Sequence, residues 1–178
     1  MSRVGRQPVA IPKGVSVELK GNRLTVKGPK GTLEREFHPD MKVLVQDGLI
    51  RVERPSDSRI HKSLHGLTRA LIANMVHGVT EGYEKALEMS GVGYRATKSG
   101  DKVILNLGFA KPVEIQPPKG IVIDVPSPTS LVIRGADKEA VGELAARIRR
   151  LRPPEPYQGS GIKYVGEKIR RKAAKTAK

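Results

Sequence analysis

Two kinds of hydrophobic spacing alternate along this chain, and together they predict an α+β fold. Apolar and polar residues alternate in short runs on either side of residues 21–22 and 100–101, which is typical of strands that bury one face. Two other segments repeat apolar residues every three or four positions, at Leu64, Leu67 and Leu71 and again at Val141, Leu144 and Ile148. This spacing predicts two helices, each with one apolar stripe packed on a sheet.

Turn-forming residues divide the strand-like runs into hairpins. Gly21-Asn22 and Gly100-Asp101 predict one hairpin in each half, and Asp47-Gly48 and Pro126–Pro128 predict a second one. The matching features follow in the same order at a spacing of about 79 residues. We therefore expect a duplication in which each copy is a small antiparallel or mixed sheet packed against one helix.

The ends of the helices suggest the limits of the domains. Ser56 or Asp57 is expected to cap the first helix and Asp137 the second, because short polar side chains accept hydrogen bonds from free helical N–H groups. The two domains should meet near residues 77–83, and proline ends the second helix at Pro153. The expected parts are a basic N-terminal arm 1–10, a first domain 11–81, a second domain 82–152 and a basic C-terminal tail 153–178.

Positive charge is concentrated at the two ends of the chain. The 178 residues carry 33 Lys and Arg against 18 Asp and Glu, a formal net charge of +15. Residues 1–30 and 152–178 carry +6 each, whereas residues 31–151 carry only +3. This distribution predicts a nucleic-acid partner that is contacted by the ends. Residues 167–178 lack an apolar stripe, so we expect them to become ordered only on binding.

Other classes of protein are disfavoured by composition. No run of residues approaches the roughly 20 apolar positions of a membrane span, and the N-terminus has no apolar leader segment. The chain has no Cys, which excludes disulfides, thiol catalysis and thiolate metal sites. We therefore expect a cytoplasmic protein with no membrane partner.

Candidate catalytic chemistry is sparse. His61 and His65 stand four residues apart and could share a metal ion, but no third ligand is suggested nearby. An RNA-facing helix edge shared with Lys62 and Arg69 is the preferred interpretation. Residues 91–93 form a glycine-rich loop that lacks the third glycine of a dinucleotide fingerprint, so a tight path before a strand is favoured. We expect no enzymatic activity, cofactor, metal or small-molecule substrate.

The aromatic content limits how nucleic acid could be bound. Six aromatic residues are too few for a platform on which a single strand stacks. Binding should instead depend on the shape and phosphates of a folded RNA. The arginines at the end of the second helix could also enter a DNA major groove, although cations there stabilise the helix dipole as well.

Longer motifs together resemble the large-ribosomal-subunit protein six family, bacterial type. They are SRVGRQPVAIPKGV, VKGPKGTL, HKSLHGLTRALIANMVHGV, GYEKALEMSGVGYRA, LNLGFAKPVEIQPPKGI and PEPYQGSGIKYVGE, which span nearly the whole chain. The resemblance implies a duplicated pair of α/β domains that bind 23S-type rRNA near the stalk base and the factor-binding region. It further implies that the second domain and tail make most RNA contacts, with ribosomal proteins and translation factors as neighbours.

The sequence departs from that family in two places. The family's tail usually reads PEPYKGKGI, whereas this chain has Gln158 and Ser160 where the two lysines stand. The family's GFSHPV segment is replaced by GFAKPV, which introduces Lys111. The first change removes two expected phosphate contacts, and the second adds a cation.

We expect a structural, non-catalytic protein that clamps folded rRNA through phosphate contacts. The expected RNA-binding residues are Arg95, Lys111, Arg149, Arg150, Arg152, Tyr157, Lys163, Tyr164, Lys168, Arg170, Arg171, Lys172, Arg3, Arg6, His65 and Arg69. Deleting residues 153–178 should then weaken RNA binding while both domains still melt cooperatively. The alternatives are a DNA- or RNA-binding protein outside the ribosome and an RNA-modifying enzyme that uses His61, His65 or the loop 91–93.

Overall fold

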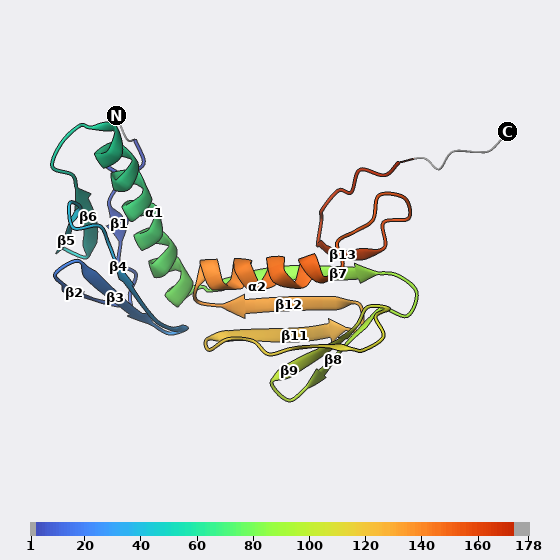
Figure 1. Cartoon of the computed structure of the whole chain (residues 1–178). Helices are drawn as coiled ribbons and strands as arrows, with labels where there is room; N and C mark the ends of the chain where they lie inside the picture. The colour runs from blue at the N-terminus through green and yellow to red at the C-terminus, as the bar shows by residue number, and fades with distance from the viewer. Residues whose placement is uncertain (1–2, 173–178) are drawn as a thin grey trace. The chain divides into compact units, whose positions relative to one another are not determined.

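The computed structural model describes residues 3–172, which divide into two compact units. The first unit runs to residue 83 and includes residues 136–138. The second unit contains residues 84–135 and the chain from residue 139 onward. Each unit combines small sheets with one long helix (Figure 1), so the predicted α+β class is confirmed.

The first unit carries two small antiparallel sheets and one helix. Its elements are β1 (Val9–Ala10), β2 (Ser16–Lys20), β3 (Arg23–Gly28), β4 (Gly31–Glu36), β5 (Lys42–Gln46), β6 (Leu49–Glu53) and α1 (Arg59–Thr80). The sheet orders are β1-β6-β5 and β2-β3-β4. The turns predicted at residues 21–22 and 47–48 do connect β2 to β3 and β5 to β6. The helix packs on β3 and β6, with which it shares the core of the unit.

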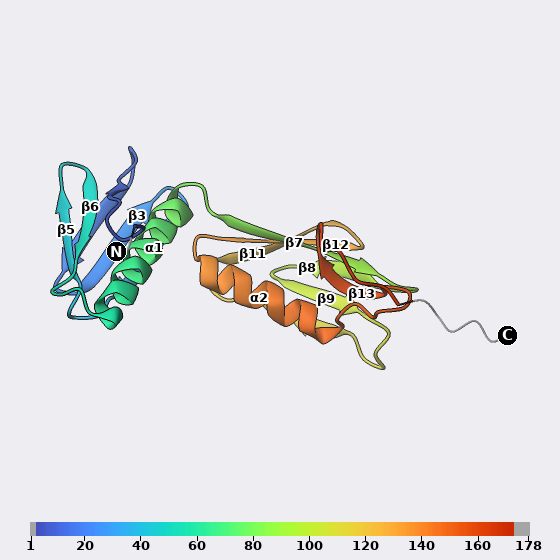
Figure 2. The same ribbon diagram turned by 90° about the horizontal axis from the view of Figure 1, so that it is seen from above.

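The second unit repeats this plan and adds one strand. Its elements are β7 (Tyr83–Ser90), β8 (Arg95–Ser99), β9 (Lys102–Asn106), β10 (Val113–Ile115), β11 (Ile121–Ser127), β12 (Ser130–Gly135), α2 (Lys138–Leu151) and β13 (Gly161–Tyr164). The sheet orders are β10-β9-β8 and β11-β12-β7-β13. Seen from above, α2 runs alongside the strands of the larger sheet (Figure 2). It buries Val141, Leu144 and Ile148 as predicted.

The strand orders show the duplication directly. The order β1-β6-β5 in the first unit corresponds to β7-β12-β11 in the second, and β2-β3-β4 corresponds to β8-β9-β10. In each unit the long helix follows the second strand of the later hairpin. Sequence spacing identified the hairpins and helices of this repeat. It missed the equivalence of β1 and β7, because β1 has only two residues and carries no recognisable pattern.

The buried face of α1 differs from the predicted stripe. The side chains that it buries are His65, Thr68, Ile72, Met75, Val76 and Val79, together with Gly78. Leu67 is 54% exposed, and Leu64 and Leu71 lie at the edge of the core. The prediction was wrong for Leu67, while Leu64 and Leu71 do pack against the core. Apolar residues cover a wide arc of this helix, so their spacing alone did not select the arc that meets the sheets.

The N-cap residue of α1 also differs from the prediction. Ser58 is the N-cap, and its side chain accepts a hydrogen bond from the N–H of His61. The expected caps have other partners: Asp57 accepts from Arg54, and the hydroxyl of Ser56 bonds to the ring of His61. The choice between neighbouring polar residues was therefore decided by local side-chain hydrogen bonds with Arg54 and His61. Neither helix is long and apolar enough within the described range to cross a membrane.

Parts of both charged ends belong to the folded units. Val9 of the expected arm lies in β1 and is only 7% exposed. Ile162 of the expected tail lies in β13, pairs with Met89 of β7 and is fully buried. The N–H of Lys172 donates to the carbonyl of Pro156. Part of the expected tail is therefore a strand of the second unit. Of residues 167–178, which are expected to order only on binding, residues 173–178 lie outside the described residues.

Candidate nucleic-acid interface

Arg152 joins two loops and the end of α2 within the second unit. Its Nε donates a hydrogen bond to the hydroxyl oxygen of Tyr94 at 3.0 Å. Its guanidinium carbon lies 5.7 Å from the centroid of the Phe109 ring. Tyr94 precedes β8, and Phe109 lies between β9 and β10. The contact of one arginine with both aromatic rings therefore defines a surface formed by three segments that are distant in the sequence.

Three exposed cations belong to the segments that form this surface. Arg95 is the first residue of β8, Lys111 follows Phe109 by two positions, and Arg150 lies in the last turn of α2. All three are exposed, and none has an acidic partner among residues 3–172. Cations without carboxylate partners keep their positive potential, which attracts phosphate groups.

Other predicted RNA-binding residues already have partners inside the second unit. Arg149 donates through Nε and Nη2 to the two carboxylate oxygens of Glu167, and this bond holds the pKa of Glu167 below its usual value. Lys163 pairs with Glu88 at 2.9 Å. The guanidinium carbon of Arg149 also lies 5.7 Å from the centroid of the Tyr164 ring. These contacts attach the C-terminal segment to the unit.

The loop between α2 and β13 is organised around one carboxylate. Glu155 accepts the backbone N–H of Tyr157 at 2.9 Å and that of Gly159 at 2.7 Å, and it also accepts from Gln158 and Ser160. The bond from Tyr157 is the main cause that lowers the pKa of Glu155. Gln158 and Ser160 thus support the loop through their backbone N–H groups, and Ser160 also through its hydroxyl, while Tyr157 is 57% exposed.

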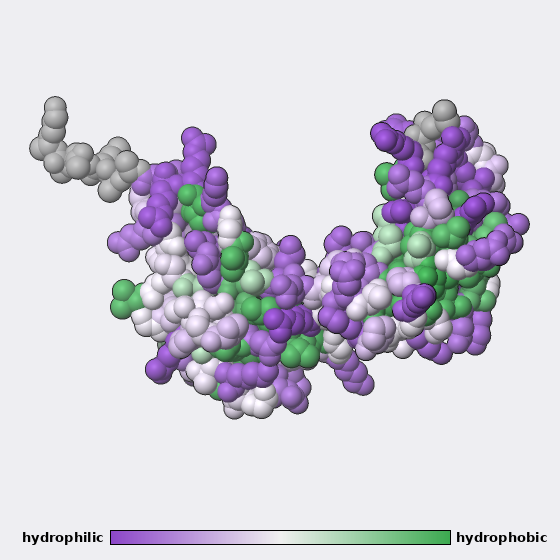
Figure 3. All heavy atoms as spheres, turned by 180° about the vertical axis from the view of Figure 1, so that it is seen from behind, coloured by the Kyte–Doolittle hydropathy of each residue, from purple (hydrophilic) through white to green (hydrophobic). Residues whose placement is uncertain are grey.

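The last described residues add further charge to this part of the unit. The cations that sequence analysis selected there are all exposed, namely Lys168, Arg170, Arg171 and Lys172. In the space-filling view, hydrophilic atoms dominate the surface of the second unit where the C-terminal segment lies (Figure 3). Arg95 and Arg152 therefore share this surface through Tyr94 and Phe109. Lys111 and Arg150 lie on the loop and the helix that contribute to it, whereas the tail cations follow β13.

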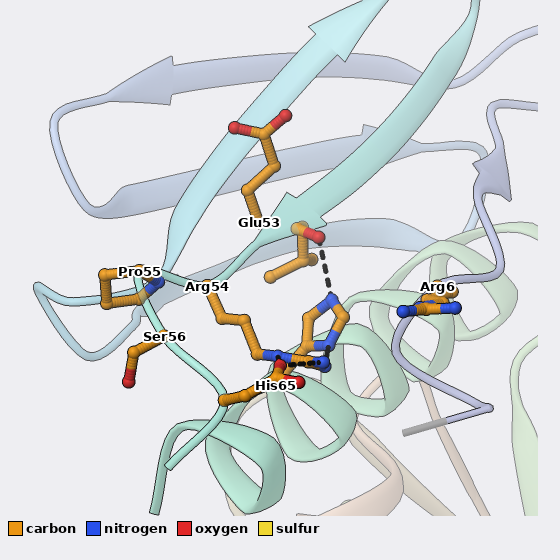
Figure 4. Close-up of a pocket in the computed structure, with 8 residues that line it drawn as sticks. Arg6, Glu53, Arg54, Pro55, Ser56 and His65 are labelled. Atoms are coloured by element: carbon orange, nitrogen blue, oxygen red, sulfur yellow. Dashed lines mark hydrogen bonds and ion pairs between the residues drawn. The ribbon is translucent and has the colours of Figure 1, made fainter. Parts of the chain in front are cut away.

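His65 of the first unit is not available to RNA. Its side chain is buried, with 4% exposure, and Nε2 donates to the carbonyl oxygen of Val52 at 2.8 Å. Because that carbonyl can only accept, Nδ1 is the acceptor for Nη1 of Arg54 at 2.8 Å (Figure 4). The expectation of an exposed, RNA-facing His65 is therefore wrong, since the ring is a hydrogen-bonded part of the core.

The other predicted RNA-binding residues of the first unit either belong to its N-terminal segment or contact it. Nε of Arg69 donates to the carbonyl of Gln7 at 3.1 Å. Arg3 and Arg6 are exposed, and Arg6 lines a cavity together with Arg54 and His65 (Figure 4). A hydrogen bond from Arg54 lowers the pKa of the Asp57 carboxyl at the same cavity.

The histidine pair of α1 does not converge on a shared ion. Nε2 of His61 lies 3.2 Å from a carboxylate oxygen of Asp40, whereas His65 faces Arg54. The described residues contain no group of three potential metal ligands. The two rings therefore have separate structural partners.

The cavity beside Arg152 was not predicted from the sequence. It has a volume of about 470 Å³ and is lined by Gly93, Tyr94, Arg95, Asn106, Gly108 and Phe109. The available signal was an aromatic residue next to glycine in two different loops, at Gly93-Tyr94 and Gly108-Phe109. That signal became meaningful only when the fold placed the two loops together.

Comparison with known proteins places these features in a family. The sequence pattern of "Ribosomal protein L6" matches residues 11–82 and again residues 90–165, so both units are copies of one family domain. The chain is 58% identical over 176 residues to "Large ribosomal subunit protein uL6" of Carboxydothermus hydrogenoformans, which covers 99% of this chain and 97% of the relative. It is 59% identical over 178 residues to the protein of the same name from Geobacillus stearothermophilus, with full coverage of both chains. The relative from Shouchella clausii is 58% identical over the same length, again with full coverage. With two domain matches and relatives that are similar from end to end, the chain belongs to the ribosomal protein L6 family.

Proposed function

We propose that this chain is a structural, non-catalytic component of the large ribosomal subunit that binds folded 23S-type rRNA through its second unit. The names of its relatives support the first part of the proposal. The single observation that carries the RNA contact is that the segments meeting at Arg152 carry exposed cations with no acidic partner among residues 3–172. Membership of a family of ribosomal proteins also argues against the RNA-modifying enzyme.

The proposed mode of binding combines a rigid surface with phosphate contacts. Arg152 holds Tyr94 and Phe109, so the surface has a defined shape before RNA arrives. Arg95, Lys111 and Arg150 then neutralise phosphates and release counterions, which makes the affinity depend strongly on salt. Folded RNA is the suitable partner because proteins recognise it largely by shape and backbone.

The resemblance noted from sequence extends the proposal to a location. It favours a position near the stalk base and the factor-binding region of the cytoplasmic ribosome, with neighbouring ribosomal proteins and translation factors as partners. Crosslinking of the intact particle, with each lysine and tyrosine mapped to RNA or protein, tests this location. Crosslinks confined to rRNA and proteins far from the stalk would overturn it.

The RNA contact is tested by comparing two pairs of substitutions with the same change in charge. We expect the pair Lys111→Gln and Arg150→Gln to weaken binding to deproteinised large-subunit rRNA by about tenfold or more. It should also reduce the slope of log affinity against log salt by about 1.5 to 2. The matched control pair in the first unit is Lys13→Gln and Lys42→Gln, at two exposed positions.

Two results would contradict the proposed RNA contact. Equal losses from both pairs would mean that the interaction follows net charge and not this surface. If duplex DNA competes for the protein as well as folded rRNA does, the DNA-binding alternative is favoured.

A further inference from the structure

The cavity beside Arg152 has a composition that simple phosphate binding does not explain. The chain contains only six aromatic residues, and two of them, Tyr94 and Phe109, line this one cavity. The same cavity holds a cation, Arg95, and a side-chain amide, Asn106. Phosphate contacts need only hydrogen-bond donors or cations, whereas a concentrated pair of rings and an amide indicates recognition of a ligand with a flat apolar face and a polar edge.

The ring of Phe109 is fixed and still accessible. The guanidinium of Arg152 lies 5.7 Å from its centroid, and 43% of the residue remains exposed. The hydroxyl oxygen of Tyr94 accepts the N–H of Arg152 Nε, which fixes Tyr94 as a wall of the cavity. An aromatic ring that is held in place and exposed offers a stacking surface with little loss of conformational entropy.

The polar groups of the cavity lie beside each other on neighbouring strands. Arg95 and Asn106 are direct partners in the register of β8 and β9. Within the described part of the chain, the Asn106 amide has no hydrogen-bond partner and Arg95 has no ion pair. An amide can both donate and accept, as the edge of a base requires, and a guanidinium suits a phosphate.

The loop before β8 allows a ligand to approach closely. Gly93 has a φ of 74°, and no atom lies within 4 Å of the position that a side chain would occupy there. The backbone is therefore open on that side. A side chain at this position would fill the open space and would also be strained by the positive φ.

We propose that this cavity holds one unpaired nucleobase of the rRNA, stacked on Phe109, with its edge on Asn106 and its phosphate at Arg95. The proposal rests on the proposed function and specifies what its surface recognises. One exposed ring suits one base and not a strand, which agrees with the low aromatic content of the chain. An apolar peptide would stack equally well but would leave Arg95 and Asn106 without partners.

The test separates stacking from shape and from charge. Phe109→Leu keeps an apolar side chain but removes the ring, and we expect about tenfold weaker binding to deproteinised large-subunit rRNA. Phe109→Tyr keeps the ring and should bind like the unchanged protein. The salt slope should be the same for all three proteins because the ring carries no charge. Asn106→Ala is a second variant that should weaken binding without changing that slope.

A photocrosslink identifies the occupant directly. A benzoylphenylalanine at position 109 of the full chain should crosslink to one unpaired nucleotide, mapped by reverse transcription. The same group at the exposed position Val122 is the control and should give no such single site. Crosslinks to paired nucleotides, or to another protein in the assembled particle, would overturn the base-pocket proposal.

The outcomes also distinguish this proposal from the proposed function. If Phe109→Leu binds normally while the pair Lys111→Gln and Arg150→Gln binds weakly, the base pocket is wrong and the RNA surface stands. If the unchanged protein shows no salt-dependent binding to rRNA, both proposals fail.

Discussion

Arg149 of α2 makes a bidentate hydrogen bond to the carboxylate of Glu167: Nε donates to Oε2 at 3.0 Å, and Nη2 donates to Oε1. The same Oε2 accepts the N–H of Tyr164 at 3.0 Å, at the end of β13. One carboxylate therefore connects the helix, the added strand and the segment that follows it. A stretch whose charge is typical of a nucleic-acid tail is in this way attached to the folded unit.

Replacing Glu167 should loosen this attachment. Glu167→Gln removes the charge that holds Arg149, and we expect a loss of about 1 kcal/mol in the stability of the second unit. Hydrogen exchange of the amides in residues 161–165 should become faster. Glu143→Gln, at an exposed position on α2, is the control and should leave exchange unchanged. Unaltered exchange in Glu167→Gln would show that β13 pairing alone holds the segment.

Acid should destabilise the second unit. The pKa of Glu155 and that of Glu167 are both lower in the folded protein than their ordinary value of 4.5, through backbone N–H groups and Arg149 respectively. A lowered folded pKa stabilises the fold above the unfolded pKa, and this stabilisation is lost as the pH falls through the folded pKa. Urea midpoints should therefore fall from pH 6 toward pH 3. The variant Glu155→Gln should flatten that dependence, and an equally steep decline would contradict the assignment.

His65 should matter for stability and not for RNA. The substitution His65→Ala leaves the carbonyl of Val52 and the Nη1 of Arg54 without their partner, at a cost of about 1–3 kcal/mol. Thermal melting measures the loss. Affinity for rRNA, measured well below the melting temperature, should be unchanged. Arg59→Ala, at an exposed position on the same helix, is the stability control. If His65→Ala is folded but binds RNA more weakly, the prediction from sequence that His65 contacts RNA would be right.

The close approach of Gly5 to His65 can be tested by a single methyl group. A Cβ at Gly5 would lie 2.5 Å from Nδ1 of His65, so Gly5→Ala should destabilise the first unit by about 1–3 kcal/mol. Gly142→Ala is the matched control, because nothing lies within 4 Å of its Cβ position in α2. That control should stabilise the protein by up to about 1 kcal/mol, since alanine favours helix over glycine. Chemical denaturation of both variants should therefore give shifts of opposite sign.

Two truncations should separate the structural part of the tail from its charged part. Deleting residues 153–178 removes β13 and the buried Ile162, so we expect the second unit to melt early, contrary to the expectation from sequence. Deleting residues 168–178 keeps β13 and Glu167. It should preserve most of the stability while lowering the salt slope of rRNA binding. If the longer deletion melts like the full chain, β13 is dispensable for folding.

Local features of the fold were predictable because their causes are local. The hairpins at residues 21–22, 47–48 and 100–101 follow from turn residues between strand-like runs, and α2 follows from one narrow apolar stripe. The duplication was also predictable, because the same signals recur in the same order and the family pattern matches twice. Net charge indicated the class of partner, and the chain's length and composition indicated an ordinary folded protein.

The tertiary structure decided which residues are available to a partner, because burial depends on contacts between segments that are distant in the sequence. α1 is apolar over a wide arc, so only packing on β3 and β6 selected His65 for the core and left Leu67 exposed. The strand β13 pairs with β7 more than 70 residues earlier, which no local pattern reveals. The surface around Arg152 likewise exists only where two loops meet the end of α2. Sequence alone therefore determined the hairpins, the two helices, the repeat and the sign of the charge, whereas long-range packing placed β13 and determined which charges and rings form a site.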